Sequence, residues 1–184
     1  SAAGLTIVSG LAQGIDAAAH LGGLAAEGST IAVLGTGVDK PYPQANAALA
    51  AQIAERGLLG SEFALGTKAL AYNFPRRNRL ISGLAQGCLV IEAALASGSL
   101  ITARSAAEQG REVFALPGSI HSPLSKGCHS LIKSGAKLVE SAEDVLSELG
   151  AFRRTGFAST RSRPDAADAG ARSEEPLLGY MGFD

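Results

Sequence analysis

Three arginines stand at positions 76, 77 and 79, directly after Pro75, in the stretch NFPRRNRLISGLAQGCLVIE of residues 73–92. No aspartate or glutamate lies between Glu62 and Glu92, so these arginines and Lys68 give the segment a local charge of +4. Guanidinium groups bind phosphate oxygens through parallel hydrogen bonds. The pattern therefore indicates a phosphate-binding site. The alternative is a solvated helix end whose arginines pair with Glu62 or Glu92, and composition alone leaves both open.

A helix is expected to carry these arginines. Pro75 suits the first turn of a helix, because its missing N–H would have no partner there, and Gly87 suits the left-handed position just past the end. The helix is therefore predicted at about residues 76–86. At about 100° per residue, Arg76 and Arg79 fall on the outer side, whereas Arg77 falls near the apolar side and is expected to reach beneath the helix start. Positive charge at a helix N-terminus opposes the helix dipole, which favours an anionic partner.

Short apolar runs alternate with helical patterns along most of the chain. Strands are predicted at residues 5–8, 31–34, 58–62, 88–92, 112–116 and 137–140, with a helix after each. This alternation predicts an α/β fold that is Rossmann-like, with a mostly parallel sheet and helices on both faces. Ligands of such sheets bind beyond the carboxyl ends of the strands, where Ser9, Gly10, Gly37 and Gly118 lie. Glycines and helix N-termini there can present N–H groups, so a phosphate-bearing ligand is expected.

Composition excludes several classes of protein. The net charge is −1 over 184 residues, so a nucleic-acid partner must be held by a local patch. Although 46% of residues are hydrophobic, no apolar run has the length of a membrane span. Cys88 and Cys128 imply no disulfide framework, and a reducing cytoplasm is the expected compartment. His121, Cys128 and His129 match no standard zinc spacing, so neither a metal nor another cofactor is expected.

Two further pairs of residues could carry chemistry. Asp16 and His20 stand four residues apart on a predicted helix, where a surface contact is favoured over a catalytic pair. Asp39 and Lys40 lie next to a proline-rich loop. They either shape a ligand cleft or form a simple turn, and the sequence does not separate the two.

The chain divides into three parts. Residues 1–150 form the α/β domain, which starts directly before a strand and is expected to be cut from a longer chain. Residues 151–176 are rich in charged residues, Ala, Ser and Gly, which is typical of a flexible linker. Residues 177–184 (LLGYMGFD) are apolar again and are expected to start a truncated C-terminal domain.

Five sequence words, in this order, carry a resemblance to a known family. They are SGLAQGID (9–16), GTGVDKPYPQAN (35–46), FPRRNRLISGLA (74–85), IEAALASGSLITARSAAEQGREVFALPG (91–118) and GCHSLIKSGA (127–136). Together they resemble the DNA-processing protein A family, DprA/Smf. The resemblance implies a single-stranded DNA-binding protein, and not an enzyme, that protects incoming DNA in natural transformation and loads the RecA recombinase during DNA recombination. It also implies a cytoplasmic homodimer, for which Leu131 and Ile132 are candidate contacts.

Site residues follow from the same resemblance. The family's arginine motif falls on Phe74, Pro75, Arg77, Asn78 and Arg79, with Arg76 in its variable slot, its glycine-rich turn on Ser9 and Gly10, and its Ser-Gly helix start on Ser97, Gly98 and Thr102. Phosphate contacts are implied for Arg77 and Arg79, and a base stacked on Phe74. Contacts of this kind are worth about 1–3 kcal/mol each.

The chain departs from the family at both ends. The family's first βα unit, with its Gly-Ser-Arg turn, is expected to be missing, which removes one wall of the DNA pocket. The C-terminal winged-helix-like domain of many members is represented at most by residues 177–184.

Two other functions stay open. One is a nucleotide-binding Rossmann-like enzyme, such as the lysine-decarboxylase-like phosphoribohydrolases that cleave nucleoside monophosphates. Their pattern places a glutamate three residues after a threonine, whereas Ser105 follows Thr102 here, so the general acid/base is missing. The other is an interaction scaffold with purely structural arginines. Salt dependence separates a scaffold from a DNA-binding protein, because phosphate contacts weaken steeply as salt rises.

Overall fold

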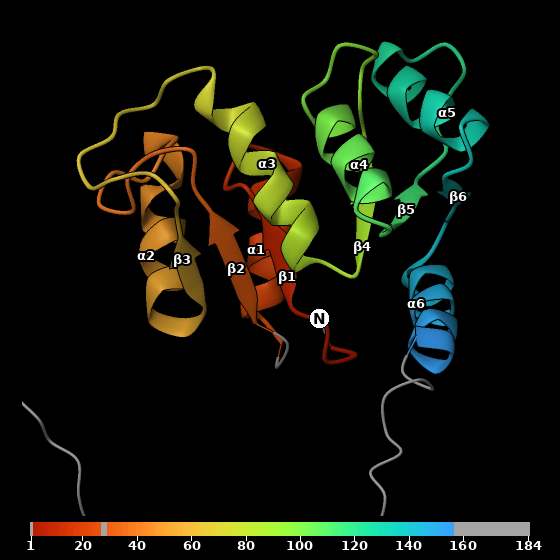
Figure 1. The fold of residues 1–184 in the computed structure, drawn as a ribbon, viewed down its shortest axis with the longest axis horizontal. Coiled ribbons are helices and arrows are strands. Elements are labelled where there is room, and N and C mark those ends of the chain that lie inside the picture. Colours follow the sequence, from red (N-terminus) through yellow and green to blue (C-terminus); the bar gives the residue numbers. More distant parts are fainter. Residues whose placement is uncertain (1, 27–28, 157–184) are drawn as a thin grey trace, which may run out of the picture.

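The computed structural model describes residues 2–26 and 29–156, along which strands and helices alternate (Figure 1). The strands are β1 (Ile7–Ser9), β2 (Thr30–Val33), β3 (Leu58–Gly60), β4 (Gly87–Val90), β5 (Glu112–Ala115) and β6 (Lys137–Leu138). The α-helices are α1 (Ile15–Leu24), α2 (Ala47–Arg56), α3 (Asn73–Leu84), α4 (Ser99–Glu108), α5 (Lys126–Lys133) and α6 (Ala142–Gly156). Short 3-10 turns, η1 (Gln44–Asn46) and η2 (Pro123–Ser125), lead into α2 and α5.

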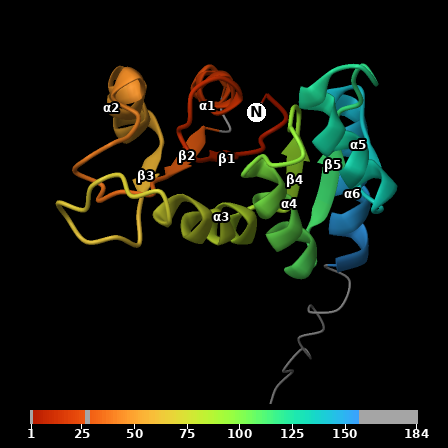
Figure 2. The ribbon, with the colours of Figure 1, turned by 90° about the horizontal axis from the view of Figure 1, so that it is seen from above.

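The strands form two parallel sheets of three, in the orders β1-β2-β3 and β4-β5-β6. Val8 lies opposite Ile31 in the first sheet, and Leu89 lies opposite Phe114 in the second. Figure 2 shows β1 and β4 as the inner strands of the two halves, with each half extending outward from them. The predicted α/β, Rossmann-like arrangement is confirmed.

Helices cover both faces of the first half. Figure 2 shows α1 and α2 on one face and α3 on the other, and α3 continues across to pack against α4 of the second half. Each half has a core of its own. The first is built on Leu11, Leu24, Leu34, Leu49 and Ile53, and the second on Val90, Leu100, Ala103, Ala115 and Cys128. Phe114, Val139 and Leu149 form a third cluster, against which Leu5 packs.

The inner strands β1 and β4 are not paired with each other. Both main-chain groups of a residue in a parallel strand point to one side, and the next residue points to the other. In β1, the N–H of Ile7 is hydrogen-bonded on the β2 side, so the N–H and carbonyl of the next residue, Val8, point away from β2. In β4, the carbonyl of Val90 is hydrogen-bonded on the β5 side, so the N–H and carbonyl of Leu89 point away from β5. The main-chain groups of Val8 and Leu89 are therefore directed toward the space between the halves. Leu89 is 44% exposed, although strands of parallel sheets are normally buried. The two inner edges therefore lack strand partners among the described residues.

Every predicted strand and helix is present, with shifted ends. The arginine helix begins earlier than expected, at Asn73, and Pro75 lies in its first turn. Gly87 is not a left-handed helix cap, so that prediction is wrong. It is the first residue of β4, and a Cβ there would lie 2.7 Å from the ring of Phe114. Close packing against an aromatic ring is what requires glycine at this position.

The end of the described chain differs from the predicted division. Helix α6 continues to Gly156, so residues 151–156 of the predicted linker are helical. The remainder of the linker and the expected start of a C-terminal domain, residues 157–184, lie outside the described residues. None of the described helices combines the length and the apolar character that crossing a bilayer requires.

Candidate nucleic-acid interface

A cavity of about 610 Å³ opens between the two halves, along β4 and around the carboxyl ends of β1 and β4. We call it cavity A. Its walls come from β1 and the turn after it, α3, β4 and the start of α4. All the predicted site residues except Arg76 and Arg79 line it: Ser9, Gly10, Phe74, Arg77, Asn78, Ser97, Gly98 and Thr102. The chain runs outward in opposite directions from this point, and open α/β sheets bind ligands at such a switch point.

Arg77 lies beneath the start of α3 and is 6% exposed. Its Nη1 donates hydrogen bonds to the main-chain oxygen of Gly10, at 2.9 Å, and to that of Val33. Its Nε donates to Oδ1 of Asn78 at 3.2 Å. The prediction that this side chain reaches under the helix is confirmed. Burial lowers the pKa of Arg77 from its ordinary value, although an arginine remains charged in proteins. Its contact with phosphate stays a prediction.

Asp16 closes the glycine-rich turn after β1. Its Oδ2 accepts the N–H groups of Gly10, at 3.0 Å, and of Ala12, at 3.2 Å. Between them, Leu11 is fully buried with a φ of 62°. The N–H of Gly10 is therefore engaged within the protein. Glycine is required at position 10 for another reason, because a Cβ there would lie 2.5 Å from Nη2 of Arg77.

His20 is fully buried, so the expected surface contact with Asp16 is wrong. Its Nδ1 lies 2.7 Å from Oγ1 of Thr30, whose hydroxyl donates to the carbonyl of Ile7 at 2.9 Å. The hydroxyl has one proton, so it accepts from Nδ1–H, and Nε2 is buried without a partner among the described residues. Burial lowers the pKa of His20, Asp16 opposes that shift and Arg77 adds to it. A neutral ring with this tautomer supports the fold rather than the chemistry of the cavity.

The wall of cavity A between Asn78 and the start of α4 is polar and uncharged. Nδ2 of Asn78 lies 3.5 Å from the carbonyl of Gly98, and Oγ of Ser97 accepts the N–H of Ser99 at 3.3 Å. Thr102 lines the cavity one turn further along α4. Among the described residues that line cavity A as a whole, Asp16 and Arg77 are the charged ones, so their formal charges cancel. The lining therefore offers hydrogen bonds without net charge.

An aromatic pair forms one end of the cavity. Phe74 is half-buried and packs so closely on Gly35 that a Cβ there would lie 2.7 Å from its ring. The ring of Tyr42 follows, with centroids 5.7 Å apart, and both rings line the cavity. The guanidinium carbon of Arg77 lies 6.0 Å from the centroid of Phe74. An aromatic face is thus held in place next to polar groups.

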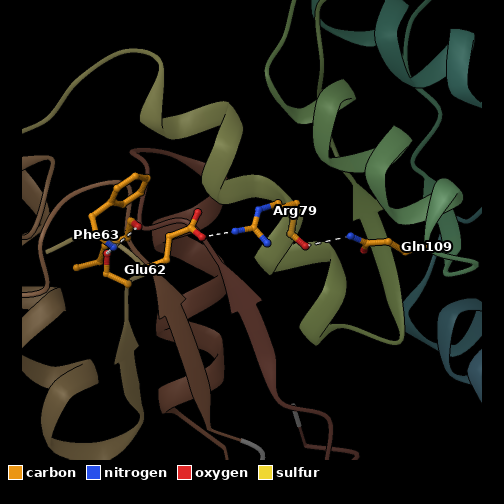
Figure 3. A network of polar contacts seen from close by, with 6 residues as sticks. Glu62, Phe63, Arg79 and Gln109 are labelled. Atoms are coloured by element: carbon orange, nitrogen blue, oxygen red, sulfur yellow. Dashed lines mark hydrogen bonds and ion pairs between the residues drawn. The ribbon is translucent and has the colours of Figure 1, made fainter.

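Arg76 and Arg79 lie on the outer side of α3, as the helical period predicts. Nη2 of Arg79 forms an ion pair with Glu62, and Nε2 of Gln109 donates a hydrogen bond to the main-chain oxygen of Arg79 at 3.2 Å (Figure 3). The alternative of a carboxylate pair with Glu62 therefore holds for Arg79. The guanidinium carbon of Arg76 lies 5.9 Å from the ring centroid of Phe63, and within the described part of the chain Arg76 forms no ion pair.

Both cysteines are free thiols. Cys88 lines cavity A, and burial raises its pKa to about 11, so it is a poor nucleophile at neutral pH. Cys128 is fully buried, with Sγ 3.7 Å from the carbonyl of Val90. Nε2 of His129 lies 3.0 Å from the carbonyl of Gly118. In the described ranges no three metal-ligating side chains come together.

Several residues that line cavity A were not among the predicted site residues, including Gln13, Asp16 and Tyr42. The signal that selected Ser9 and Gly10 could have found these three, because Gln13 and Asp16 follow β1 closely and Tyr42 follows β2. Positions just beyond strand ends converge on one edge of a parallel sheet.

Known proteins resemble this chain in sequence. The family described as DNA recombination-mediator protein A matches residues 1–150. Protein Smf of Escherichia coli (strain K12) is 59% identical over 147 residues, which cover 79% of this chain and 39% of that protein. DNA processing protein DprA of Streptococcus pneumoniae (strain ATCC BAA-255 / R6) is 56% identical over 144 residues, which cover 78% of this chain and 51% of that protein.

Two solved structures share the fold. The X-ray structure of DNA processing protein A from Streptococcus pneumoniae superposes with a TM-score of 0.73 and 54% identity, over 78% of this chain and 51% of that one. A structure concerned with the single-stranded DNA binding mode of DNA processing protein A from Helicobacter pylori superposes with a TM-score of 0.71 and 30% identity, over 80% of this chain and 66% of that one. The chain thus spans about half or less of the curated relatives described above. Because the match extends over the whole α/β domain, this chain belongs to the DNA recombination-mediator protein A family, DprA/Smf.

Proposed function

We propose that this chain binds single-stranded DNA, with little sequence preference, in cavity A. The observation that carries the proposal is the convergence of Ser9, Phe74, Asn78 and Thr102, from three separate parts of the chain, on a cavity at the switch point of the sheet. The relative from Helicobacter pylori supports it, because its structure concerns single-stranded DNA binding. A polar wall beside an aromatic face suits unpaired bases, which stack on rings whatever their identity.

Each side chain has a distinct role in this proposal. Phe74 stacks a base, while Asn78 and the start of α4 at Ser97 contact the backbone, where a helix N-terminus favours phosphate. The side chain of Arg77 is held in place by the hydrogen bonds of its Nη1 to main-chain oxygens. Its Nη2 forms no hydrogen bond to the described residues, so it can donate to a phosphate. Arg79 contacts phosphate by giving up its ion pair with Glu62. This exchange costs little free energy, because the pair is exposed.

The same proposal makes the protein a binding protein and not an enzyme. Asp16 is the one carboxylate among the described residues that line cavity A, and it already accepts two main-chain N–H groups. His20, the other half of the candidate catalytic pair, is buried behind Thr30. General acid/base catalysis needs a group that is free to exchange a proton with the substrate. His20 does not line the cavity, and the Asp16 carboxylate serves as an acceptor for the main chain.

Fluorescence anisotropy with single-stranded and double-stranded oligonucleotides tests the proposal. The variant Phe74→Leu keeps bulk against Gly35 but removes the ring, so affinity for single-stranded DNA should fall about tenfold, in line with ~1–3 kcal/mol per stacked base. Arg79→Ala should also weaken binding and make it less salt-dependent. Lys133→Ala is the matched control, since Lys133 is exposed on α5 and lines no described cavity.

Circular dichroism must first show that each variant is folded. Binding that is equally strong for duplex and single strand, or that is unchanged in both Phe74→Leu and Arg79→Ala, would remove cavity A as the DNA site. Binding that does not weaken as salt rises would instead favour an interaction scaffold, because phosphate contacts release counterions.

We also propose that a further parallel strand, from a βα unit outside the described residues, fits between β1 and β4. Val8 and Leu89 direct unpaired main-chain groups toward each other's strand, and both line cavity A. In this proposal the strand takes the part of cavity A between β1 and β4, and DNA takes the part at their carboxyl ends. Buried main-chain groups require hydrogen-bond partners. A form of the protein that carries this unit should resist urea better and bind single-stranded DNA more tightly than residues 1–184. Equal stability and affinity of the two forms would contradict the proposal.

The wider role proposed for the protein follows its family: protection of incoming DNA in natural transformation, recombination and RecA loading, in the cytoplasm. A homodimer belongs to the same proposal. Leu131 and Ile132 are half-buried against the second core, which leaves part of each side chain for a partner. Sedimentation velocity at tens of micromolar should show a dimer, and a monomer there would count against it. A RecA strand-exchange assay with coated DNA tests the loading role.

A further inference from the structure

A second cavity of about 480 Å³, which we call cavity B, lies on the same carboxyl-end face of the first half. It forms where the loop after β2 meets the loop between β3 and α3. Lys40 comes from the first loop and Lys68 from the second. Tyr42 lines both cavities, so cavity B begins where the aromatic end of cavity A stops. The two cavities are therefore neighbours with one wall in common.

The two loops that carry these lysines are fixed to each other. The N–H of Gly37 donates to the carbonyl of Thr67 at 3.0 Å, and the N–H of Gly66 donates to Oδ1 of Asp39 at 2.8 Å. A Cβ on Gly37 would lie 2.6 Å from that carboxylate oxygen. Oγ1 of Thr36 donates to the carbonyl of Lys40 at 2.7 Å, which holds the loop next to the lysine. The backbone positions of both lysines are thus set before any ligand arrives.

The charge of cavity B differs from that of cavity A. Lys40 and Lys68 are exposed, and neither forms an ion pair within residues 2–26 and 29–156. Asp39 is the one carboxylate among the described residues lining the cavity, and it is engaged by the N–H of Gly66. The lining is therefore formally +1, against zero for cavity A. Two unpaired ammonium groups facing one space fit a phosphate.

We propose that a bound polynucleotide continues from cavity A, across the ring of Tyr42, into cavity B, where Lys40 and Lys68 hold a backbone phosphate. This inference rests on the proposed function of cavity A. Tyr42 is 50% exposed and tilted 40° to Phe74, so it can support the base that follows the one on Phe74. Lysines bind phosphate as point charges and do not select a base. Asp39 and Lys40 lie in a turn, in which the N–H of Lys40 donates to the carbonyl of Gly37 at 2.9 Å, and in this proposal the turn also shapes a ligand cleft.

Oligonucleotide length separates the two cavities. We would measure anisotropy with oligothymidylates of about 4 and about 15 nucleotides, a range that spans the site sizes of single-strand binders. Only the longer one is expected to reach cavity B. Lys40→Ala and Lys68→Ala should each reduce the slope of log K against log salt by about 0.7 for the long oligonucleotide. Neither should affect the short one, and Lys40→Arg should behave like the wild type.

Lys133→Ala again controls for the loss of one exposed positive charge, and Phe74→Leu should weaken both lengths. Unchanged slopes for the long oligonucleotide in both lysine variants would overturn the inference, while the Phe74→Leu result would still support cavity A. Equal losses for both lengths would also overturn it. The alternative is that cavity B binds free anions. In that case inorganic phosphate would stabilise the protein, Lys40→Ala would remove this stabilisation, and the salt slope of DNA binding would not change. That result would overturn the inference in favour of an anion site.

Discussion

The substitution Gly10→Ala tests how the cavity is built. A Cβ at position 10 would lie 2.5 Å from Nη2, 2.7 Å from Nη1 and 2.7 Å from Cζ of Arg77. A flexible side chain could usually move away, but this guanidinium is held by two main-chain carbonyls, of Gly10 itself and of Val33. Adding one methyl group should therefore displace Arg77 from the ends of β1 and β2.

The expected loss of stability follows from the hydrogen bonds that the displaced guanidinium of Arg77 would lose. A hydrogen bond from a charged donor contributes about 1.5–3 kcal/mol, and Nη1 makes two of them. Water in cavity A can compensate part of the loss, because Arg77 lines that cavity. We expect Gly10→Ala to lower the free energy of unfolding by about 2–4 kcal/mol, a large share of the ~5–15 kcal/mol typical of a domain.

Urea unfolding in a double-mutant cycle with Arg77→Ala is the assay. Once the guanidinium is absent, the three atoms nearest the added methyl group are gone, so Gly10→Ala should change stability by less than about 1 kcal/mol in that background. Gly60→Ala is the matched control, since nothing lies within 4 Å of a Cβ there. Equal destabilisation by Gly10→Ala in both backgrounds would refute the reasoning, because the effect would not pass through Arg77.

Three further predictions concern titration, ion pairing and thiol chemistry. Burial lowers the pKa of His20 in the folded protein, so as pH falls the unfolded chain binds a proton at this residue before the folded protein does. The stability that His20 contributes is therefore complete above about pH 6.5, the ordinary pKa of histidine, and is lost as pH falls below that value. Urea midpoints at several pH values should fall less steeply with acid in His20→Leu than in the wild type, and parallel slopes would contradict this. Arg79→Ala should lower stability by less than about 1 kcal/mol, because the pair with Glu62 is exposed; a calorimetric loss of several kcal/mol would contradict an exposed pair. The Cys88 thiol, with a pKa of about 11, should react slowly with a disulfide reagent at pH 7 and faster as pH rises, and fast reaction at pH 7 in Cys128→Ser would contradict its burial.

The sequence predicts the elements well because apolar runs and helical periods are local signals. It also predicts the inward direction of Arg77, since the helical period places that position near the apolar side. The acceptors of Arg77 are a different matter. Gly10 is 67 residues away, and no local pattern links the two positions. The need for glycine at position 10 follows only once α3 crosses the end of β1.

Asp16 and His20 show the limit of a spacing rule. An i, i+4 pair has the same spacing whether the second residue faces solvent or the core. What decides is Thr30, which lies in the neighbouring strand and supplies the hydroxyl for Nδ1 of His20. The unpaired edges of β1 and β4 are likewise invisible in the sequence, because a strand's own residues do not state whether a neighbour is present.

The charges of the site indicate where DNA affinity should arise. Asp16 and Arg77 cancel in the wall of cavity A, so this wall can provide fit and hydrogen bonds but little long-range attraction. Lys40 and Lys68 in cavity B and Arg76 on the outer side of α3 are exposed cations that form no ion pair with the described residues. Long-range attraction to phosphate weakens with salt, whereas stacking on Phe74 does so much less. The salt slope should therefore report the outer cations, while the affinity that persists at high salt should report Phe74.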